Sequence, residues 1–351
     1  MRRCSQLVLL LAIVLASLPL HAQSKAKAEN VPEIPYDSVP NFLKLPPHLY
    51  LGEGIGVATN SKGHVFVYTR SADTRLFEFD RTGAFVREIG PGLYGFEFAH
   101  AVRVDRDDNV WAVDEGTNMV IKFNPEGRVV MVLGRRPEAV EGIVAPAPGA
   151  PAPPAEPYVF SRPTDVGWDK AGNIFVTDGY GNSRVVKFDR NGRFVKEAGT
   201  RGSERGQLNL PHTMAMDADG NVYVGDRSNA RVQVFDNDLN VKAIYDNVGN
   251  PWAVCISPGP HQYLFVSNSL PDNGLAQYKD ITGEIYKMEL DGTILGRFGK
   301  AGKMLKEFST VHEIDCRNPN ELLVSEITAW RVQKIILHPP AAAAHGKQVA
   351  R

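Results

Sequence analysis

Short runs of apolar residues alternate along the chain with turns rich in Asp, Asn and Gly, most regularly between Thr164 and Gly199. This stretch reads TDVGWDKAGNIFVTDGYGNSRVVKFDRNGRFVKEAG. Its apolar runs are short and rich in Val, Ile and Phe, which is typical of strands joined by tight turns. The stretch therefore predicts four consecutive antiparallel strands, the first spanning 164–168.

The same unit recurs six times along the chain. Aligned on the start of the first strand, the copies begin at Ile55, His100, Thr164, His212, Trp252 and His312. Repeated four-stranded units are typical of a β-propeller, whereas a sandwich or barrel would not explain the repeat. We predict an all-β fold, a six-bladed β-propeller, over residues 42–338.

Closure of the ring should use the N-terminal part of the chain. The last copy ends after a third strand at Arg331–Leu337, which would leave a sheet edge exposed. We expect the segment Phe42–Leu51 to complete the last blade, with 23–41 as a linker. The other expected segments are a Pro/Ala-rich loop insert at 137–157 and a flexible tail at 339–351.

The start of the sequence predicts export. Arg2 and Arg3 precede an apolar run at Leu7–Leu18, and Leu20–Ala22 fits a cleavage site. The run is too short for a membrane span. We expect a signal peptide at 1–22 and a periplasmic or secreted protein with no membrane span after cleavage.

Composition narrows the picture further. Cys255 and Cys316 lie in predicted inner strands of neighbouring blades, and we expect buried free thiols there rather than a disulfide. The net charge of −1 and the lack of a basic stripe argue against nucleic acid as a partner.

Three histidines occupy the first position of every second repeat: His100, His212 and His312. In each of these repeats we expect the fifth residue after the histidine to open a turn; these residues are Asp105, Asp217 and Arg317. The ninth residue after that one is acidic in all three repeats: Asp114, Asp226 and Glu326. The first strand of each blade lines the channel of a propeller, so alternate blades would bring three imidazoles together. Such a set with open coordination positions is typical of catalytic zinc, although a single channel histidine is more often a hydrogen-bonded core residue. Iron, cobalt or copper would also suit three imidazoles.

The turn after the second strand opens at the same end of the channel. Its repeated Asp and Asn fit a structural role, because their side chains accept backbone N–H bonds in turns. Arg70, Tyr180 and Arg227 depart from that pattern. Two arginines suit a carboxylate, and a tyrosine near a dication could act as a base. Taken singly, each could equally be an arginine in a surface turn or an aromatic filling a gap.

The run from Ser161, with DGYGNSR, and the later LPHTMAMDADGNVYVGDRSNARVQVF resemble peptidylglycine α-hydroxyglycine α-amidating lyases. That family consists of six-bladed propellers of the NHL-repeat type, and the resemblance covers about residues 42–338. It implies cleavage of the C–N bond of a peptidyl-α-hydroxyglycine, giving a peptide amide and glyoxylate. Gly181 and Tyr223 stand where animal members have disulfide cysteines, and Thr310 replaces a methionine of the substrate pocket.

Carried over by motif, the resemblance implies site residues of four kinds. It implies zinc on His100, His212 and His312, a catalytic tyrosine at Tyr180, active-site arginines at Arg70 and Arg227, and a structural Ca²⁺ held by carbonyls of Val57 and Val102 and by Glu313, which replaces the usual aspartate.

We therefore expect a zinc-dependent carbon–nitrogen lyase that acts as a monomer on a small peptide or α-hydroxyglycine-like substrate. The alternative is a non-catalytic NHL propeller that binds a peptide, glycan or protein on one face, because fold alone does not decide function. A lactonase-like propeller hydrolase ranks last, since those enzymes need carboxylates and asparagines where this chain has histidines.

Overall fold

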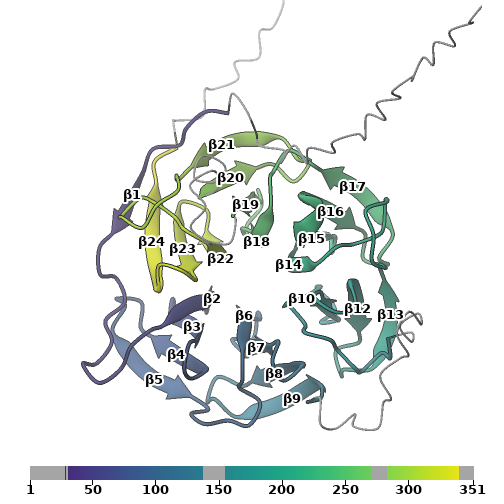
Figure 1. Cartoon of the computed structure of the whole chain (residues 1–351), viewed down its shortest axis with the longest axis horizontal. Helices are drawn as coiled ribbons and strands as arrows, with labels where there is room; N and C mark the ends of the chain where they lie inside the picture. The colour runs from purple at the N-terminus through teal and green to yellow at the C-terminus, as the bar shows by residue number, and fades with distance from the viewer. Residues whose placement is uncertain (1–27, 29–30, 137–154, 270–282, 340–351) are drawn as a thin grey trace, which may run out of the picture.

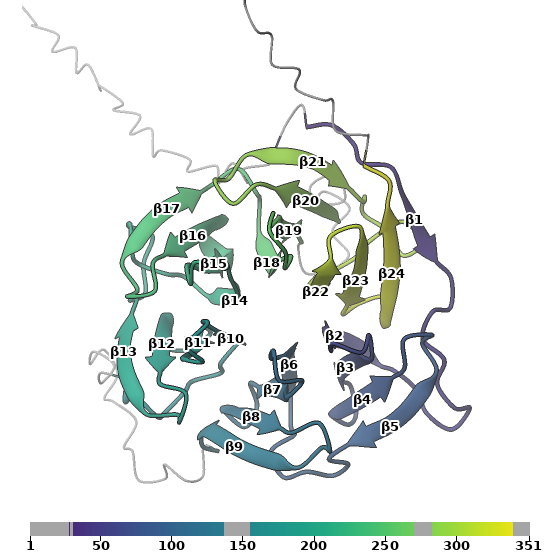
Figure 2. The ribbon, with the colours of Figure 1, turned by 180° about the vertical axis from the view of Figure 1, so that it is seen from behind.

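The computed structural model describes residues 28, 31–136, 155–269 and 283–339. Within them, six four-stranded antiparallel sheets are arranged as blades around a central axis (Figure 1). The view from behind shows the same ring, with the first strand of each blade nearest the axis (Figure 2). The predicted all-β, six-bladed propeller is confirmed.

The first three blades are built from consecutive strands. Blade 1 comprises β2 (Glu53–Thr59), β3 (Val65–Arg70), β4 (Arg75–Phe79) and β5 (Phe85–Ile89). Blade 2 comprises β6 (Ala99–Val104), β7 (Val110–Asp114), β8 (Met119–Phe123) and β9 (Val129–Gly134). Blade 3 comprises β10 (Asp165–Trp168), β11 (Ile174–Asp178), β12 (Arg184–Phe188) and β13 (Phe194–Ala198).

Blades 4 and 5 are also built from consecutive strands, whereas blade 6 takes its outer strand from the N-terminal part of the chain. Blade 4 comprises β14 (Pro211–Met216), β15 (Val222–Asp226), β16 (Arg231–Phe235) and β17 (Val241–Tyr245), with a short 3-10 helix η2 (Arg227–Asn229) after β15. Blade 5 comprises β18 (Pro251–Ile256), β19 (Leu264–Asn268), β20 (Glu284–Met288) and β21 (Ile294–Phe298). Blade 6 comprises β22 (Val311–Asn318), β23 (Glu321–Glu326), β24 (Arg331–Leu337) and β1 (Tyr36–Val39).

An aspartate at the end of the inner strand fixes the following turn in several blades. In blade 3, Asp169 Oδ1 accepts the N–H groups of Ala171 and Asn173 at 2.9 Å each. The turn reverses at Gly172, whose φ of +85° favours glycine. Asp105 and Asp217 bind their turns in the same way. The polar spacing seen in the sequence is therefore turn chemistry.

In blade 6 the expected turn at Arg317 is wrong. β22 continues to Asn318, which pairs with Glu321, so this inner strand ends two residues later in its repeat than β6 and β14 do. The reason is local, because blade 6 has no aspartate at this repeat position to bind an earlier turn.

The core lies between the blades. Six clusters of buried apolar side chains each join two neighbouring blades, including one between blade 6 and blade 1. Burial of both faces of the middle strands explains their nearly continuous apolar runs. Because every blade is packed on both sides, the inner strands are held rigidly around the axis.

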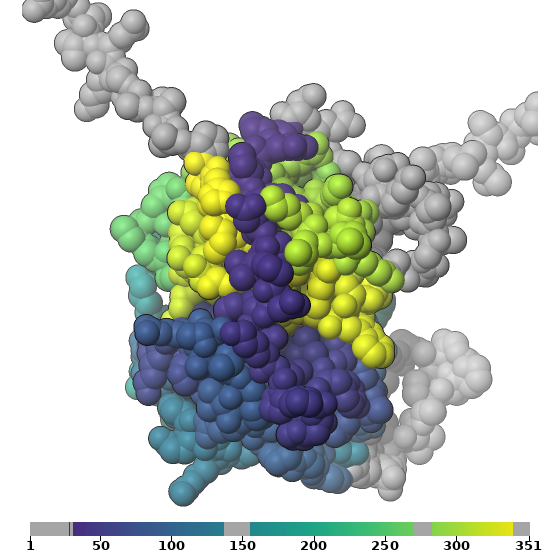
Figure 3. Space-filling view, turned by 90° about the vertical axis from the view of Figure 1, so that its left-hand side faces the viewer, coloured from purple at the N-terminus to yellow at the C-terminus, as the bar shows by residue number. Residues whose placement is uncertain are grey.

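Ring closure uses the N-terminal segment, as predicted, but with different residues. β1 pairs antiparallel with β24 from Tyr36 to Val39, so the expected linker 23–41 contains the closing strand. The segment Phe42–Leu51, which we expected to close the ring, instead packs over the cluster between blades 6 and 1. Pro46 and Pro47 lack the N–H groups that a closing strand needs. Figure 3 shows this segment lying across the junction of the two blades.

The two cysteines form a disulfide, which corrects the expectation of free thiols. Cys255 on β18 and Cys316 on β22 have Cα atoms 6.1 Å apart, within the range that a disulfide spans. Both cysteines lie on inner strands, and the closure of the ring places the inner strands of adjacent blades side by side, which sequence spacing does not show. The bond joins blade 5 to blade 6.

Several predicted segments lie outside the described residues: the signal peptide 1–22, most of the insert 137–157 and nearly all of the tail 339–351. Among the described residues, no helix has the length and apolar character that crossing a membrane would require.

Candidate metal centre

A β-bulge positions the first-strand residue of most blades. In blades 2, 4 and 6 the register shifts across His100, His212 and His312, so that two residues on the inner strand oppose one on its neighbour. Ile55 in blade 1 lies at an equivalent shift. A bulge re-aims a side chain out of the regular alternation of a strand. The repeat therefore directs its first residue toward the channel.

The acidic residues that recur at one position of the histidine-bearing repeats have a structural role. Asp114, Asp226 and Glu326 each end the second strand of a histidine-bearing blade and accept the backbone N–H of the residue three positions before the histidine. The Asp226 contact, to Asn209 N–H, is 2.7 Å long. These bonds anchor the chain that leads into each histidine.

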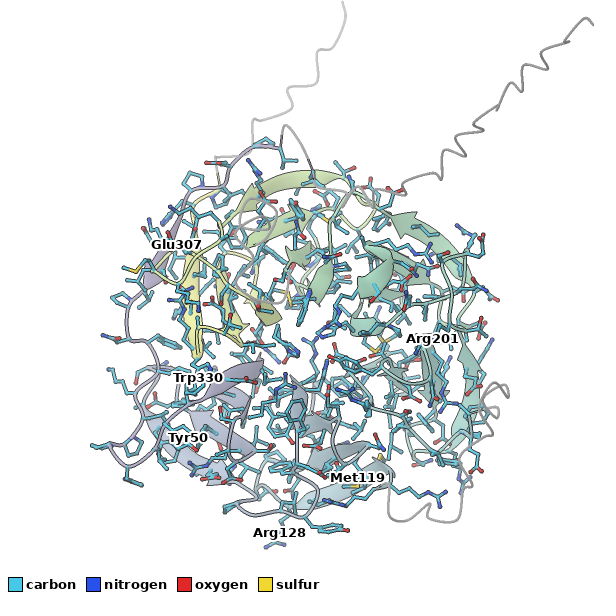
Figure 4. All side chains as sticks on the ribbon, in the orientation of Figure 1. Tyr50, Met119, Arg128, Arg201, Glu307 and Trp330 are labelled. Carbon is cyan, nitrogen blue, oxygen red and sulfur yellow. A yellow bond between two sulfur atoms is a disulfide. The ribbon has the colours of Figure 1, made fainter. Side chains whose placement is uncertain are left out.

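The three histidines meet at the centre of the ring. Their ring centroids lie 4.7 to 4.8 Å apart, and one ligand atom from each lies within 4.8 Å of the other two. All three side chains are almost fully buried. The stick view shows side chains from the surrounding strands filling the middle of the ring (Figure 4). The structure thus brings together the predicted ligands, which we call the histidine centre.

Each histidine is oriented by the blade that follows it. Nδ1 of His100 lies 2.6 Å from the carbonyl oxygen of Thr164, Nδ1 of His212 lies 2.7 Å from that of Trp252, and Nδ1 of His312 lies 3.1 Å from that of Ile55. A carbonyl oxygen can only accept, so Nδ1 carries the proton and Nε2 keeps a lone pair. The odd blades thereby fix the tautomer that a metal needs.

The electrostatics of the centre keep the rings neutral. Burial lowers the pKa of all three histidines well below the usual value, and the positive charge of Arg227 lowers each of these pKa values further. Nε2 of His100 and Nε2 of His212 are buried without a hydrogen-bond partner among the described residues. Unpaired buried acceptors are costly, so these atoms fit a bound cation. Three neutral imidazoles are a suitable donor set for zinc.

Arg70, Tyr180 and Arg227, the three large residues of the turns after the second strands, have different contacts around the histidine centre. The ring of Tyr180 lies 5.5 Å from that of His100 and 6.2 Å from that of His212. Arg227 hydrogen-bonds to Tyr180 and lies 4.2 Å from the ring centroid of Trp252. Arg70 is bound by Glu53 at 2.8 Å and by the carbonyl of Ala99 at 3.1 Å, and its charge lowers the pKa of His100 and of His312.

The pKa of Tyr180 reflects opposing effects. Burial raises it, and the neighbouring Glu115 raises it further, while Arg227 and Arg70 lower it. The net direction is upward in the protein without an ion. A phenolate at this position therefore needs an additional positive charge beside it.

Comparison with known proteins identifies the repeat. The NHL repeat model matches residues 160–188 and 208–235. The mouse NHL repeat-containing protein 3 is 30% identical over 302 residues, which cover 82% of this chain and 80% of that protein. The chain belongs to the NHL-repeat family.

A second relative bears on chemistry. The Caenorhabditis elegans probable peptidyl-alpha-hydroxyglycine alpha-amidating lyase pgal-1 is 30% identical over 220 residues, or 55% of this chain. The match spans 58% of the length of that relative. Among solved structures, a streptogramin B lyase aligns with a TM-score of 0.53 at 14% identity, covering 87% of this chain and 98% of the other. That likeness shows the fold alone.

The expected calcium residues of this NHL propeller lie together, but their contacts do not fit the ion. Oε2 of Glu313 accepts the N–H groups of Val57 at 3.0 Å and Val102 at 3.2 Å. Its Oε1 forms an ion pair with Nε of Arg103 at 2.9 Å. A calcium ion needs oxygen ligands, whereas the contacts of the Glu313 carboxylate are with N–H groups and a cation.

Arg103 also pairs with a second carboxylate. Its Nε and Nη2 bind Asp165 at 2.9 and 2.6 Å, which is a bidentate contact. Burial raises the pKa of Glu313 to about 8, although Arg103 lowers it. We call Arg103, Asp165 and Glu313 the arginine centre. It lines the same small cavity as the histidine centre, and its guanidinium contacts the one side chain expected to bind calcium.

Sequence reasoning missed two residues at the mouth of the channel. Glu115 is 2% exposed, and its carboxylate binds Arg162, whose guanidinium lies 4.3 Å from the ring centroid of Tyr180. A signal was present, because Glu115 follows Asp114 in the repeat position that holds Arg227 in blade 4. Treating that turn as structural concealed it.

The four other described histidines, including His48, lie outside the histidine centre. His64, His261 and His338 bind Glu78, Glu289 and Asp37 respectively. None belongs to the histidine centre.

Proposed function

We propose that this protein is a zinc-dependent lyase that cleaves the C–N bond of an α-hydroxyglycine-type substrate, giving an amide and glyoxylate. The observation that carries the proposal is the convergence of three neutral, carbonyl-oriented imidazoles beside Tyr180 and Arg227. The similarity to an amidating lyase supports this choice of reaction.

His100, His212 and His312 would hold the ion through Nε2. A bound zinc ion supplies Lewis acidity, which lowers the pKa of a coordinated hydroxyl. Arg227 hydrogen-bonds to Tyr180 and forms no ion pair among the described residues, so N–H groups of its guanidinium remain to bind the substrate carboxylate. Arg70 would assist, although Glu53 already binds it.

Tyr180 would accept the hydroxyl proton of the substrate. The C–N bond then breaks, its electron pair goes to the departing amide nitrogen, and the hydroxyl carbon becomes the aldehyde of glyoxylate. The nitrogen takes up one proton, so the reaction consumes no other reactant. Arg227, which hydrogen-bonds to Tyr180, stabilises the phenolate form against the effect of burial.

Export is part of the proposal. The Cys255–Cys316 disulfide supports a periplasmic or secreted location, because disulfides persist in oxidising compartments.

The decisive test is an assay for glyoxylate with a small α-hydroxyglycine derivative and metal-loaded protein. We expect turnover that depends on about one transition ion per chain, as three protein ligands and an open position require. Metal binding without any glyoxylate would favour the alternative, a propeller that only binds a peptide, glycan or protein.

A further inference from the structure

Glu115 lies directly beside the histidine centre. Its Oε1 is bound by Arg162, and its Oε2 is buried with no hydrogen-bond partner among the described residues. Oε2 lies 3.6 Å from Nε2 of His100. The carboxylate of Glu115 therefore lies against His100 at the edge of the histidine centre.

The two facing atoms are both acceptors. Nδ1 of His100 uses its proton on the carbonyl of Thr164, so Nε2 offers a lone pair. A carboxylate oxygen bound to Arg162 through its other oxygen is also an acceptor. Two buried acceptors in contact are unfavourable unless a cation or a donor lies close to both.

Glu115 belongs to the outer part of this arrangement. The ligand atoms that lie within 4.8 Å of one another come from the three histidines only. Glu115 approaches from the side of His100, at the channel end where Arg162 and Tyr180 lie. This placement suits contact with the group that occupies the open position of the ion.

We propose that Glu115 selects a neutral hydroxyl or water at the open position of the ion and repels anions from it. This inference rests on the metal-holding part of the proposed function and not on lyase activity. A neutral O–H donates to Oε2, whereas an anion meets a buried like charge. An α-hydroxy acid would accordingly keep its carboxylate away from the ion and direct it to Arg227.

Arg162 acts in the opposite direction. Its guanidinium pairs with Glu115, and its side chain is 54% exposed, so it offsets part of the carboxylate charge. Removing Glu115 should therefore favour anions at the ion, and removing Arg162 should disfavour them. A purely structural role for the pair would not give effects of opposite sign.

The test uses the full chain loaded with cobalt(II), titrated with thiocyanate and followed by the visible spectrum. For Glu115→Gln we expect thiocyanate to bind about tenfold more tightly, because one negative charge near the ion is removed. For Arg162→Gln we expect weaker binding. The matched control is Glu97→Gln, which removes an exposed carboxylate that borders the same loop and pairs with Arg136.

The outcomes separate this inference from the proposed function. Cobalt uptake with unchanged or weaker thiocyanate binding in Glu115→Gln would overturn the role of Glu115 alone. A wild-type chain that takes up no cobalt would overturn the histidine centre and this inference with it. Should Glu115→Gln not fold, Arg162→Gln decides, since a change toward tighter binding there contradicts the proposal.

Discussion

The histidine centre and the arginine centre line the same small cavity but differ in the charge that their side chains supply. The three histidines of the first centre direct Nε2 lone pairs inward, and those of His100 and His212 have no hydrogen-bond partner among the described residues. Asp165 and Glu313 instead share the guanidinium of Arg103. The first centre lacks a positive charge and the second contains one.

The comparison shows that side chains at nearby positions of one repeat can differ in whether a bound cation would stabilise them. His100 and Arg103 are three residues apart on β6. A cation fits the first centre because unpaired buried acceptors are unfavourable there. At the second, an external cation would have to displace a bidentate ion pair. Chemistry that needs a metal is therefore expected at the histidines alone.

The largest effect should come from removing one ligand of the histidine centre. His212→Ala should lose bound metal and lower the rate of glyoxylate formation at least about a thousandfold, because the Lewis acid is lost. Metal analysis and the glyoxylate assay measure the two effects. The control His64→Ala, at a histidine paired with Glu78, should keep both. Retained metal in His212→Ala would contradict the convergence of the three rings on one ion.

The arginine centre should respond in stability. Arg103→Met leaves Asp165 and Glu313 buried without their cation, which should lower the free energy of unfolding by about 3–5 kcal/mol. Added calcium should restore part of the loss in this variant, as urea denaturation would show. Arg106→Met, which removes a surface bond to the Lys170 carbonyl, is the control and should change stability little.

The same measurement can break the comparison. The wild-type protein should keep its free energy of unfolding when calcium is chelated. A clear loss of stability on chelation would show that the second centre binds calcium despite Arg103.

The repeat made the histidine centre predictable and left the arginine centre hidden. Side chains at one position of every second repeat must converge if the repeats close into a ring, and they do. The partners of Arg103 come from blades 3 and 6 and share one repeat position, directly after the first residue of the repeat. Arg103 itself lies two positions further along its own repeat, so the repeat alignment did not show that the three side chains meet. The same limit explains the missed Cys255–Cys316 disulfide, which depends on the distance between two blades.

Strand positions were predictable to within a few residues where turn chemistry was regular. Blade 3 follows the expected four strands, and β24 has the predicted bounds. The closing strand was misplaced because the apolar pattern of Phe42–Leu51 resembles a strand, although that segment packs on a cluster. Burial alone does not distinguish pairing from packing.

Tyr180 tests how the histidine centre uses its ion. Tyr180→Phe should lower kcat about a hundredfold, as the loss of a proton acceptor does, while metal content stays at the wild-type level. Tyr50→Phe is the control, because Tyr50 is half exposed and lies at the outside of the ring (Figure 4). Full activity in Tyr180→Phe would exclude this residue as the base.

The smallest effect concerns acid stability of the metal-free protein and belongs to the histidine centre. Burial lowers the pKa of His100, His212 and His312, so below about pH 6.5 the unfolded chain binds protons that the folded chain does not. Stability should therefore fall as the pH drops from 6.5 to 5. Each such histidine contributes up to about 1.4 kcal/mol per pH unit to this slope. Urea denaturation of His100→Gln at several pH values should show a slope shallower by up to that amount, whereas an unchanged slope would mean that His100 is protonated in the folded protein.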